Sequence, residues 1–292
     1  MPKICLQRLL EELHQKNYLD ELEKLNSILD PNIIIFSDYI ENKPEKTFSV
    51  YSFLVTDDFQ LHQNAERLSL FREENKIPAN SFFDYKKVFQ DNQRKRLLPE
   101  YLKLTEKING LLFTVFIDKK YVKLLTNIKL SEHFEHLNFG TWKPHILAEM
   151  LITFSILAFI LSKITSREVT WLTDEDSRMG NNNDKLKLKS LRFLQAFLMG
   201  QGIQMPSHIF IQKDSEKLEF QQDRDVKSIV DLAAGSINDF IDLPEKVRDI
   251  SRDYFKWFDS KSGNLYRKSY QFYFQDNSLR VIETTFKIDL DS

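Results

Sequence analysis

Aspartate follows directly after three apolar stretches of this sequence. The acids are Asp38 after Ile33–Phe36 and Ser37, Asp118 after Leu111–Ile117, and Asp174 with Asp176 after Val169–Leu172. Unbroken apolar runs rich in β-branched residues are typical of strands covered on both faces of a sheet. We therefore predict three strands that each end in a carboxylate, although aspartate is also common in the ordinary turns that end strands.

A further acid, Asp231, lies inside the apolar run SIVDLAAGSI of a predicted helix. Burying a carboxylate among apolar side chains without a partner is costly. Strand-end carboxylates that meet one from a helix suit magnesium or manganese, because these hard ions take oxygen ligands. We therefore predict a site for one or two Mg²⁺ or Mn²⁺ ions, with ligands drawn from Asp38, Asp118, Asp174, Asp176 and Asp231.

Basic residues lie close in sequence to these acids. Phe82–Phe89 is predicted to be a strand on which Lys86 and Lys87 point to opposite faces, so that one lysine faces the acids. A lysine there would neutralise the charge of a phosphate substrate. The alternative is a solvated lysine that protects an open sheet edge.

The densest group of basic residues opens the helix predicted for Asp91–Asn109. Arg94, Lys95 and Arg96 lie within one turn of it. Such a group is a candidate surface for contacts with nucleic-acid phosphates. Equally, it could be a solvated helix face balanced by nearby glutamates.

The order of these segments resembles that of a known family. The run SIVDLAAGSI is similar to the ADLVAGAI-type motif that closes the domain in the ribonuclease-H-like proteins of domain-of-unknown-function family 3800. An early strand ending in Asp, a basic strand near SFFDYKKVF, a strand ending in IDKK, a long helix, a strand running into Asp174 and the Asp231 helix also follow the family layout. The resemblance covers roughly Ile33 to Phe240.

The resemblance implies a fold of the α/β class, with a ribonuclease-H-like mixed sheet flanked by helices, and a metal-dependent nuclease that acts on DNA or RNA. Asp38, Asp174 and Asp231, with Asp118 or Asp176 as a fourth, would bind the ions that align water for attack on a phosphodiester. Family members often occur beside mobile elements and defence genes. This implies a prokaryotic antiviral defence or toxin-like setting.

The first strand departs from the family pattern. The family usually carries Asp-Glu-Ser-Gly there, whereas Asp38 is followed by Tyr39, Ile40 and Glu41. Three residues along a strand place Glu41 on the face opposite Asp38 unless the chain turns. The alternative prediction is therefore a degenerate ribonuclease-H-like domain that acts as a noncatalytic scaffold for a protein partner.

Composition and charge narrow the possible functions. The 292 residues have a formal net charge of −2, so a polyanion would have to meet a local basic patch. The single cysteine, Cys5, allows neither an intramolecular disulfide nor a thiolate metal cluster. Because the N-terminus also has no export signal, we expect a cytoplasmic protein. The sequence has no glycine-rich phosphate loop, which excludes a P-loop or dinucleotide enzyme.

The most apolar segment, Ile146–Leu161, tests whether the chain enters a membrane. It contains Glu149 and is shorter than the ~20 residues that a span requires. A carboxylate is also costly in lipid. We therefore predict no membrane span, and a helix over Lys143–Lys163 that packs centrally beneath the sheet, with Glu149 paired or turned toward the site.

Three regions are expected along the chain. Residues 1–30 form an N-terminal helical extension, since Leu6–Leu29 is amphipathic, and it packs on the sheet edge or mediates self-association or partner binding. Residues 31–242 form the ribonuclease-H-like domain. Residues 243–292 form an aromatic-rich α+β extension, with a helix and a hairpin split at Asp276 and Asn277. Its aromatic and basic residues could stack single-stranded bases or form a satellite core.

A second strand and a pair of histidines are also predicted from the sequence. A strand over Thr47–Val55 should pair with the first strand. His133 and His136 have a spacing that can bind a metal, but no third ligand follows at a recognisable spacing. The alternative for these histidines is an exposed helix end that terminates at Gly140.

Overall fold

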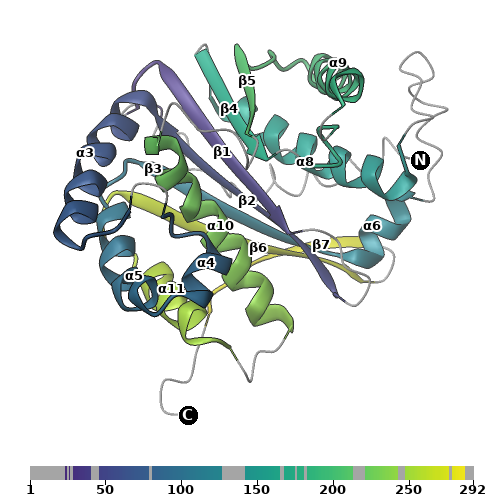
Figure 1. The fold of residues 1–292 in the computed structure, drawn as a ribbon. Coiled ribbons are helices and arrows are strands. Elements are labelled where there is room, and N and C mark those ends of the chain that lie inside the picture. The colour runs from purple at the N-terminus through teal and green to yellow at the C-terminus, as the bar shows by residue number, and fades with distance from the viewer. Residues whose placement is uncertain are drawn as a thin grey trace.

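The computed structural model describes residues 24, 26, 29–40, 46–78, 81–126, 142–164, 168–174, 176–180, 183–212, 221–242, 247–275 and 278–286. Within them, one mixed sheet is flanked by helices (Figure 1), so the predicted α/β class is confirmed. The strands are β1 (Asn32–Ile40), β2 (Phe48–Asp57), β3 (Gly110–Asp118), β4 (Glu168–Asp174), β5 (His208–Gln212), β6 (Leu265–Gln275) and β7 (Ser278–Glu283).

The order of the strands in the sheet is β5-β4-β1-β2-β3-β6-β7. β1 is antiparallel to β2 and β2 to β3, whereas β4 runs parallel to β1 and β5 runs parallel to β4. The C-terminal hairpin of β6 and β7 belongs to the same sheet, because β6 pairs in parallel with β3. β1 therefore has neighbours on both sides and lies inside the sheet.

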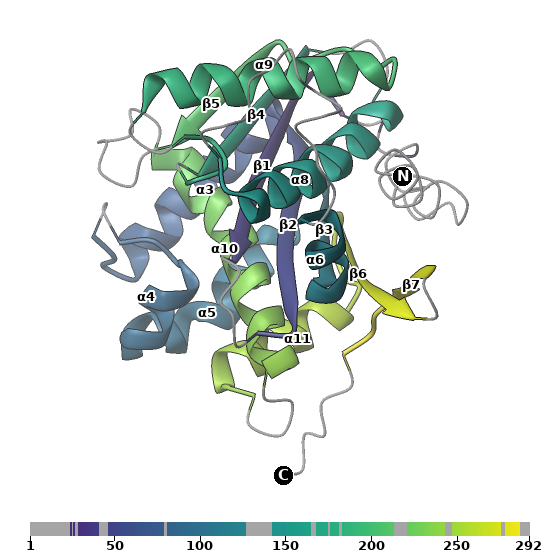
Figure 2. The same cartoon turned by 90° about the vertical axis from the view of Figure 1, so that its right-hand side faces the viewer.

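Helices cover both faces of this sheet. They are α3 (Asp58–Glu74), α4 (Tyr85–Gln90), α5 (Asn92–Thr105), α6 (Lys119–Thr126), α8 (Pro144–Lys163), α9 (Asp184–Gly200), α10 (Gln221–Asp242) and α11 (Asp249–Asp259). α6, α8 and α9 lie on one face, toward the viewer in Figure 2, and the other helices lie on the opposite face. We call these the α8 face and the α10 face.

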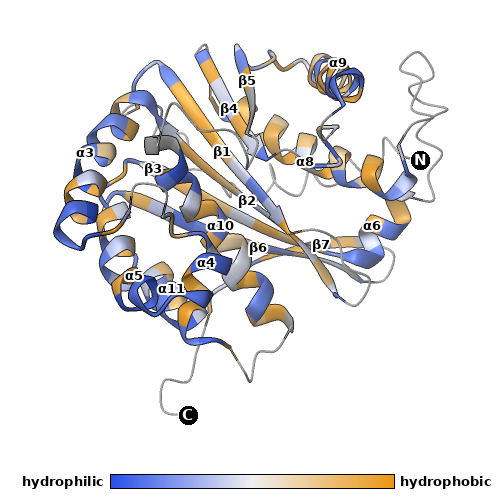
Figure 3. Cartoon of the chain, in the orientation of Figure 1, coloured by the Kyte–Doolittle hydropathy of each residue, from blue (hydrophilic) through white to orange (hydrophobic). Residues whose placement is uncertain are grey.

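The central strands are buried on both faces, which explains their unbroken apolar sequences. In β1, Ile33 and Ile35 pack into the core of the α8 face, while Ile34 and Phe36 pack into the core of the α10 face. Figure 3 shows how hydrophobic residues fill the middle strands. The alternation continues to the end of β1, so it decides which face each polar residue there will occupy.

α8 is the central helix of the α8 face, as its apolar sequence predicts. By length and composition it could cross a membrane, but 83% of its most apolar window is buried inside the protein. Glu149, within this helix, is buried as well. The burial of α8 against the sheet is that of a core helix.

The strand predicted for Phe82–Phe89 is wrong. The chain has no regular structure at residues 81–84, and helix α4 begins at Tyr85. Asp84 stands at the N-cap of α4, where its side chain makes no capping hydrogen bond, and its carbonyl accepts the N–H of Val88. Phe82 and Phe83 are buried ahead of the helix, so the aromatic pair that suggested a strand anchors the start of α4.

Several predictions fall on residues that the structure does not describe. Most of the N-terminal helix Leu6–Leu29, the residue Glu41 and the pair His133 and His136 lie outside the described residues. By contrast, the strand predicted over Thr47–Val55 and the hairpin predicted around Asp276 and Asn277 are present as β2 and as β6 with β7.

The aromatic residues of the C-terminal region pack into both cores. Phe255, Trp257 and Phe258 of α11 are buried on the α10 face. Tyr270 and Phe272 of β6 are buried on the α8 face. Tyr266 is 38% exposed. Most of this aromatic surface therefore packs within the protein.

Candidate functional site

Two carboxylates of the candidate site come from neighbouring parallel strands. Phe36 and Leu172 are register partners on β1 and β4, so Asp38 and Asp174, two residues later on each strand, stand side by side. Residues two apart on a strand share a face, which puts both acids on the α10 face with Phe36 and Leu172. A hydrogen bond joins the two carboxyl groups.

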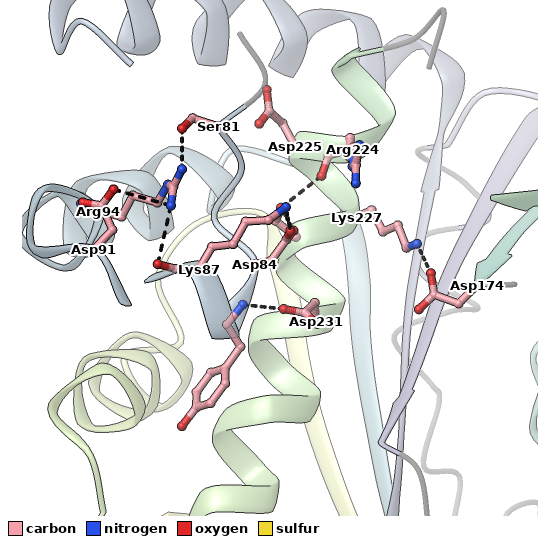
Figure 4. Close-up of polar contacts among 12 residues, drawn as sticks. Ser81, Asp84, Lys87, Asp91, Arg94, Asp174, Arg224, Asp225, Lys227 and Asp231 are labelled. Carbon is pink, nitrogen blue, oxygen red and sulfur yellow. Dashed lines mark hydrogen bonds and ion pairs between the residues drawn. The ribbon is translucent and has the colours of Figure 1, made fainter. Parts of the chain in front are cut away.

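A third carboxylate, that of Asp231 on α10, lies in the same pocket as Asp38 and Asp174. The helix packs across β1 and β2 through buried residues that include Val230 and Ala234. Asp231 accepts a hydrogen bond from the backbone N–H of Tyr85 at the start of α4 (Figure 4). Gly235, one helical turn later, allows this close approach, because a Cβ atom there would overlap the Tyr85 side chain.

These three acids line one pocket of about 400 Å³. Its full lining is Asp38, Asp84, Lys86, Lys87, Asp174, Arg224, Lys227 and Asp231. Figure 4 shows Arg224, Lys227 and Asp231 on α10, Asp84 and Lys87 at the start of α4, and Asp174 on the sheet. The structure therefore brings together four of the residues predicted from the sequence, namely Asp38, Asp174, Asp231 and Lys86.

Two lysines pair with acids of this pocket. Lys227 forms an ion pair with Asp174 across the gap between α10 and β4 (Figure 4). Lys87 Nζ lies 2.5 Å from Asp84 Oδ2. The other carboxylate oxygen of Asp84 accepts a hydrogen bond of 3.0 Å from the Ser228 hydroxyl. The pocket thus contains both acids and basic side chains, and two of its lysines form ion pairs with its acids.

Burial and crowding change the acidity of the three central carboxyl groups. Burial, then the neighbouring Asp174 and Asp231, raise the pKa of Asp38 well above its usual range. Burial, together with the negative charges of Asp84 and Asp174, raises the pKa of Asp231 to about 7. Burial also acts to raise the pKa of Asp174, but the hydrogen bond with Asp38 and the ion pair with Lys227 outweigh it and lower that pKa. Interaction with its neighbours therefore moves the pKa of Asp38 upward and that of Asp174 downward.

The structure does not bring Asp118 to this pocket. Its register partner on β2 is Phe48, which lies four residues from Ser52, the partner of Asp38. A strand rises about 3.3 Å per residue, so Asp118 is displaced by roughly 13 Å along the sheet, and it is also two strands away. Its carboxylate accepts the backbone N–H of Lys120.

Asp176 also lies outside the pocket lining. It forms an ion pair with Arg178 and accepts the backbone N–H groups of Arg178 and Met179. These contacts shape the turn that follows β4. Asp176 therefore has a structural role in the turn rather than a place beside Asp38.

A buried polar network on the α8 face lies directly behind the acids. The Tyr39 hydroxyl donates to Ser37 Oγ at 2.6 Å, and Trp171 Nε1 donates to the same oxygen at 2.9 Å. The Thr173 hydroxyl donates to the Tyr39 oxygen at 3.3 Å. Ser37 and Tyr39 flank Asp38, and Thr173 precedes Asp174. The network therefore ties β1 to β4 at the height of the two carboxylates.

Three residues of the pocket were not predicted from the sequence, namely Asp84, Arg224 and Lys227. Lys227 and Arg224 precede Asp231 by four and seven residues, a spacing that places all three on one side of a helix. This periodicity is present in the sequence. Asp84 was not predicted because the segment that contains it was wrongly assigned to a strand.

The residue types at the pocket fit a hard divalent cation. Carboxylate oxygens are its preferred ligands, and Asp38, Asp84, Asp174 and Asp231 supply them. Burial first, and then the negative charge of the neighbouring acids, raise the pKa values of Asp38 and Asp231, and a bound cation would offset both effects. Among the described residues, however, no three His, Cys, Asp or Glu side chains are already arranged to hold a metal ion. Lys227 on Asp174 and the Tyr85 N–H on Asp231 engage two of the acids.

Comparison of the chain with protein-family models, with curated proteins and with solved structures finds no match. The likeness to the ribonuclease-H-like family therefore stays a prediction from the sequence.

Proposed function

We propose that this protein is a divalent-metal-dependent phosphodiesterase that cleaves DNA or RNA. The observation that carries the proposal is the convergence of Asp38, Asp174 and Asp231, from two strands and a helix, on one pocket. The same pocket is lined by Lys86 and Arg224. A site that joins oxygen ligands for a cation to positive groups for a phosphate is suited to phosphoryl chemistry.

We also propose that the fold is ribonuclease-H-like. In support, the first five strands have the order β5-β4-β1-β2-β3, with an antiparallel β1-β2-β3 unit and two parallel strands added beside β1. This arrangement is the one expected of a ribonuclease-H-like sheet. It puts Asp38 on the central strand and Asp174 on its parallel neighbour.

Each lining residue has a part in the proposed reaction. Asp38, Asp174 and Asp231 would hold Mg²⁺ or Mn²⁺, with Asp84 as a further oxygen donor at the rim. The bound ion would activate a water molecule and stabilise the leaving oxyanion. Lys86 and Arg224 would hold the phosphodiester by its charge. The polar network of Ser37, Tyr39 and Thr173 would keep the two strand carboxylates in place.

The setting of this activity is also part of the proposal. The chain has a net charge of −2, so the basic side chains at the pocket would provide the local attraction for a polyanion. We infer nucleic acid as the substrate and the cytoplasm as the location from the sequence, and a prokaryotic antiviral-defence or toxin-like setting from its resemblance. DNA and RNA are both kept as substrates.

A noncatalytic scaffold is the second candidate function. The observation that favours it is that, within the described residues, the acids are engaged by Lys227 and by the Tyr85 N–H rather than arranged around a metal position. The two candidates differ in one measurable property, which is whether the pocket binds a divalent cation.

The test combines calorimetry with a cleavage assay. Mn²⁺ is titrated into metal-free protein, and labelled single- and double-stranded DNA and RNA are incubated with Mn²⁺ or Mg²⁺. We expect Asp38→Asn and Asp231→Asn to remove the heat of Mn²⁺ binding and to lower cleavage at least a hundredfold. Asp118→Asn is the matched control, because Asp118 ends another strand of the same sheet, outside the pocket, and it should keep both properties.

Two results would reject the phosphodiesterase. One is wild-type protein that gives no Mn²⁺ heat and no cleavage, which would favour the scaffold. The other is cleavage by Asp38→Asn at the wild-type rate, which would locate the activity elsewhere or in a contaminant. Melting curves of each variant would show whether a loss of cleavage reflects a loss of fold.

A further inference from the structure

Lys227 holds an unusual position among the charged groups of the pocket. It lies on α10 four residues before Asp231, so both side chains leave the helix on the same side. Its ammonium group forms an ion pair with Asp174 on β4 (Figure 4). The side chain of Lys227 is only 12% exposed. The lysine therefore spans the pocket from the helix to the sheet.

The other paired lysine of the pocket is placed differently. Lys87 pairs with Asp84, three residues earlier on the same segment, and its side chain is 40% exposed. Its ion pair is local and lies at the rim. Lys227, by contrast, is the lysine whose charge acts on Asp38, Asp174 and Asp231 together.

The contact between Lys227 and Asp174 uses an oxygen that a metal ion would need. The ammonium group donates to Asp174 Oδ1, and Asp174 stands beside Asp38 on the neighbouring strand. A divalent cation bound between Asp38 and Asp174 requires these same lone pairs. Two cations cannot share that position, because their mutual repulsion in a partly buried site is strong.

The backbone around Lys227 gives the lysine little freedom to withdraw with its helix. Val226, Ile229 and Val230 are almost completely buried against the sheet. Only rotation of the long lysine side chain can separate its ammonium group from Asp174. Such a rotation would leave α10 and Asp231 in place.

We propose that Lys227 is a built-in competitor of the divalent cation. In the metal-free protein it neutralises Asp174, and it must release Asp174 before the metal can bind. This inference rests on the proposed function, since it takes the pocket as the metal site. Its consequence is that the protein binds metal more weakly than its carboxylates alone would allow, so that Lys227 sets the cation concentration at which the site fills.

The test is Mn²⁺ calorimetry on full-length wild type, Lys227→Met, Lys227→Arg and Lys87→Met. Methionine keeps the length and the apolar stem of lysine but has no charge. We expect Lys227→Met to bind Mn²⁺ about tenfold more tightly than wild type. Lys227→Arg, which keeps the competing charge, should stay near the wild-type affinity. Lys87→Met is the matched control, because it removes the same charge from the same pocket without freeing Asp174, and it should change the affinity less than threefold.

Thermal unfolding provides a second readout. Without metal, Lys227→Met should melt below wild type, because Asp174 loses its partner. With saturating Mn²⁺ this variant should gain more in melting temperature than wild type does. Asp38→Asn in the Lys227→Met background should abolish the tight binding, which shows that the ion occupies the pocket and not the surface.

The outcomes separate this inference from the proposed function. If wild type binds Mn²⁺ and Lys227→Met binds it equally or more weakly, the competition is refuted while the metal site stands. If neither wild type nor Lys227→Met binds Mn²⁺, the metal site is refuted and the competition with it. Should Lys87→Met bind as tightly as Lys227→Met, general charge in the pocket and not the contact with Asp174 would be the cause, and the inference would fail.

Discussion

The guanidinium carbon of Arg178 lies 3.9 Å from the centroid of the Tyr39 ring, on the side of the sheet away from Asp38 and Asp174. Arg178 is itself held by Asp176. The Arg178 guanidinium group therefore packs on the Tyr39 ring, while the Tyr39 hydroxyl hydrogen-bonds to both Ser37 and Thr173. Asp38 and Asp174 on the α10 face are thus held in position by the buried hydrogen-bond network of Ser37, Tyr39 and Thr173 on the α8 face.

Replacing Tyr39 by phenylalanine tests this support. Tyr39→Phe keeps the ring beneath Arg178 but removes the hydroxyl that joins Ser37 and Thr173. We expect a loss of about 1 to 2 kcal/mol in the free energy of unfolding, because buried polar groups lose a partner. We also expect a severalfold weaker Mn²⁺ affinity, since the two strand carboxylates are less firmly held. Urea unfolding and calorimetry measure the two effects.

Tyr254→Phe is the matched control for that change. The Tyr254 hydroxyl is buried and has no hydrogen-bond partner among the residues that the structure describes. Its removal should leave stability unchanged or raise it slightly. A Tyr39→Phe protein as stable as wild type, with unchanged Mn²⁺ affinity, would show that the network does not position the acids.

Asp231 gives the metal-free protein a pH-dependent stability. Its pKa is about 7 in the folded protein and about 3.9 in an unfolded chain, so the folded state holds a proton more firmly. The contribution of this proton is complete below about pH 4 and is lost as the pH rises through 7. Asp231→Asn has no proton to lose. Its stability relative to wild type should therefore rise between pH 4 and pH 8, by an amount on the order of 1 to 3 kcal/mol.

Urea unfolding in the presence of a chelator, repeated across this pH range, measures that difference. The difference between the two proteins contains the titration of Asp231 and its electrostatic coupling to Asp38 and Asp174. Parallel stability curves for wild type and Asp231→Asn would mean that the Asp231 carboxyl group is not perturbed by its surroundings.

Gly235 should not tolerate a side chain. A Cβ atom at this position would overlap the Cβ and Cγ atoms of Tyr85, so α4 would have to move away from α10. We expect Gly235→Ala to cost about 1 to 3 kcal/mol of stability, despite the better helix propensity of alanine. The shift of α4 should also weaken Mn²⁺ binding, because Tyr85 donates to Asp231.

Gly200, at the end of α9, offers a control in which nothing lies within 4 Å of the added Cβ atom. Gly200→Ala should be neutral or slightly stabilising in the same chemical unfolding experiment. Equal stabilities of the two alanine variants would contradict the close packing of α4 on α10.

Arg72 and Asp225 form a buried ion pair that joins α3 to α10. Arg72 Nε donates to Asp225 Oδ2 at 2.9 Å, and the same guanidinium group donates to the carbonyl of Pro78 at 3.1 Å. Arg72→Met leaves Asp225 buried without its partner, which should cost about 3 to 5 kcal/mol. Lys268→Met breaks a more exposed pair with Glu283 and should cost less than about 1 kcal/mol. Thermal unfolding of both variants measures the contrast.

Lys86 should contribute to substrate binding without contributing to the fold. It lines the pocket, is exposed, and makes no ion pair within the described part of the chain. Lys86→Ala should weaken binding of an uncleaved oligonucleotide and lower the slope of log affinity against log salt by about 1, as expected for one lost phosphate contact. Fluorescence anisotropy at several salt concentrations provides the slope. Lys103→Ala, on the exposed side of α5, should leave it unchanged.

Local patterns in the sequence determined the strands β1, β3 and β4, the core helix α8 and the C-terminal hairpin. Each has a clear apolar pattern of its own: a strand buried on both faces is continuously apolar, a core helix is apolar all round, and the strands of the hairpin alternate. The same patterns predicted aspartates at the strand ends. For the short segment Phe82–Phe89 the local pattern wrongly predicted a strand where the structure has the start of a helix. A few aromatic residues can be buried ahead of a helix as well as within a strand.

The tertiary structure alone decided which acids meet. Asp38 and Asp174 come together because β1 and β4 are parallel neighbours in matched register, whereas Asp118 is carried away by the antiparallel strand β2 that separates β3 from β1. Register and strand order depend on how distant segments pack, and no local periodicity records them. The same is true of Lys227, whose helical spacing to Asp231 is visible in the sequence but whose ion pair with Asp174 exists only because α10 lies across the sheet.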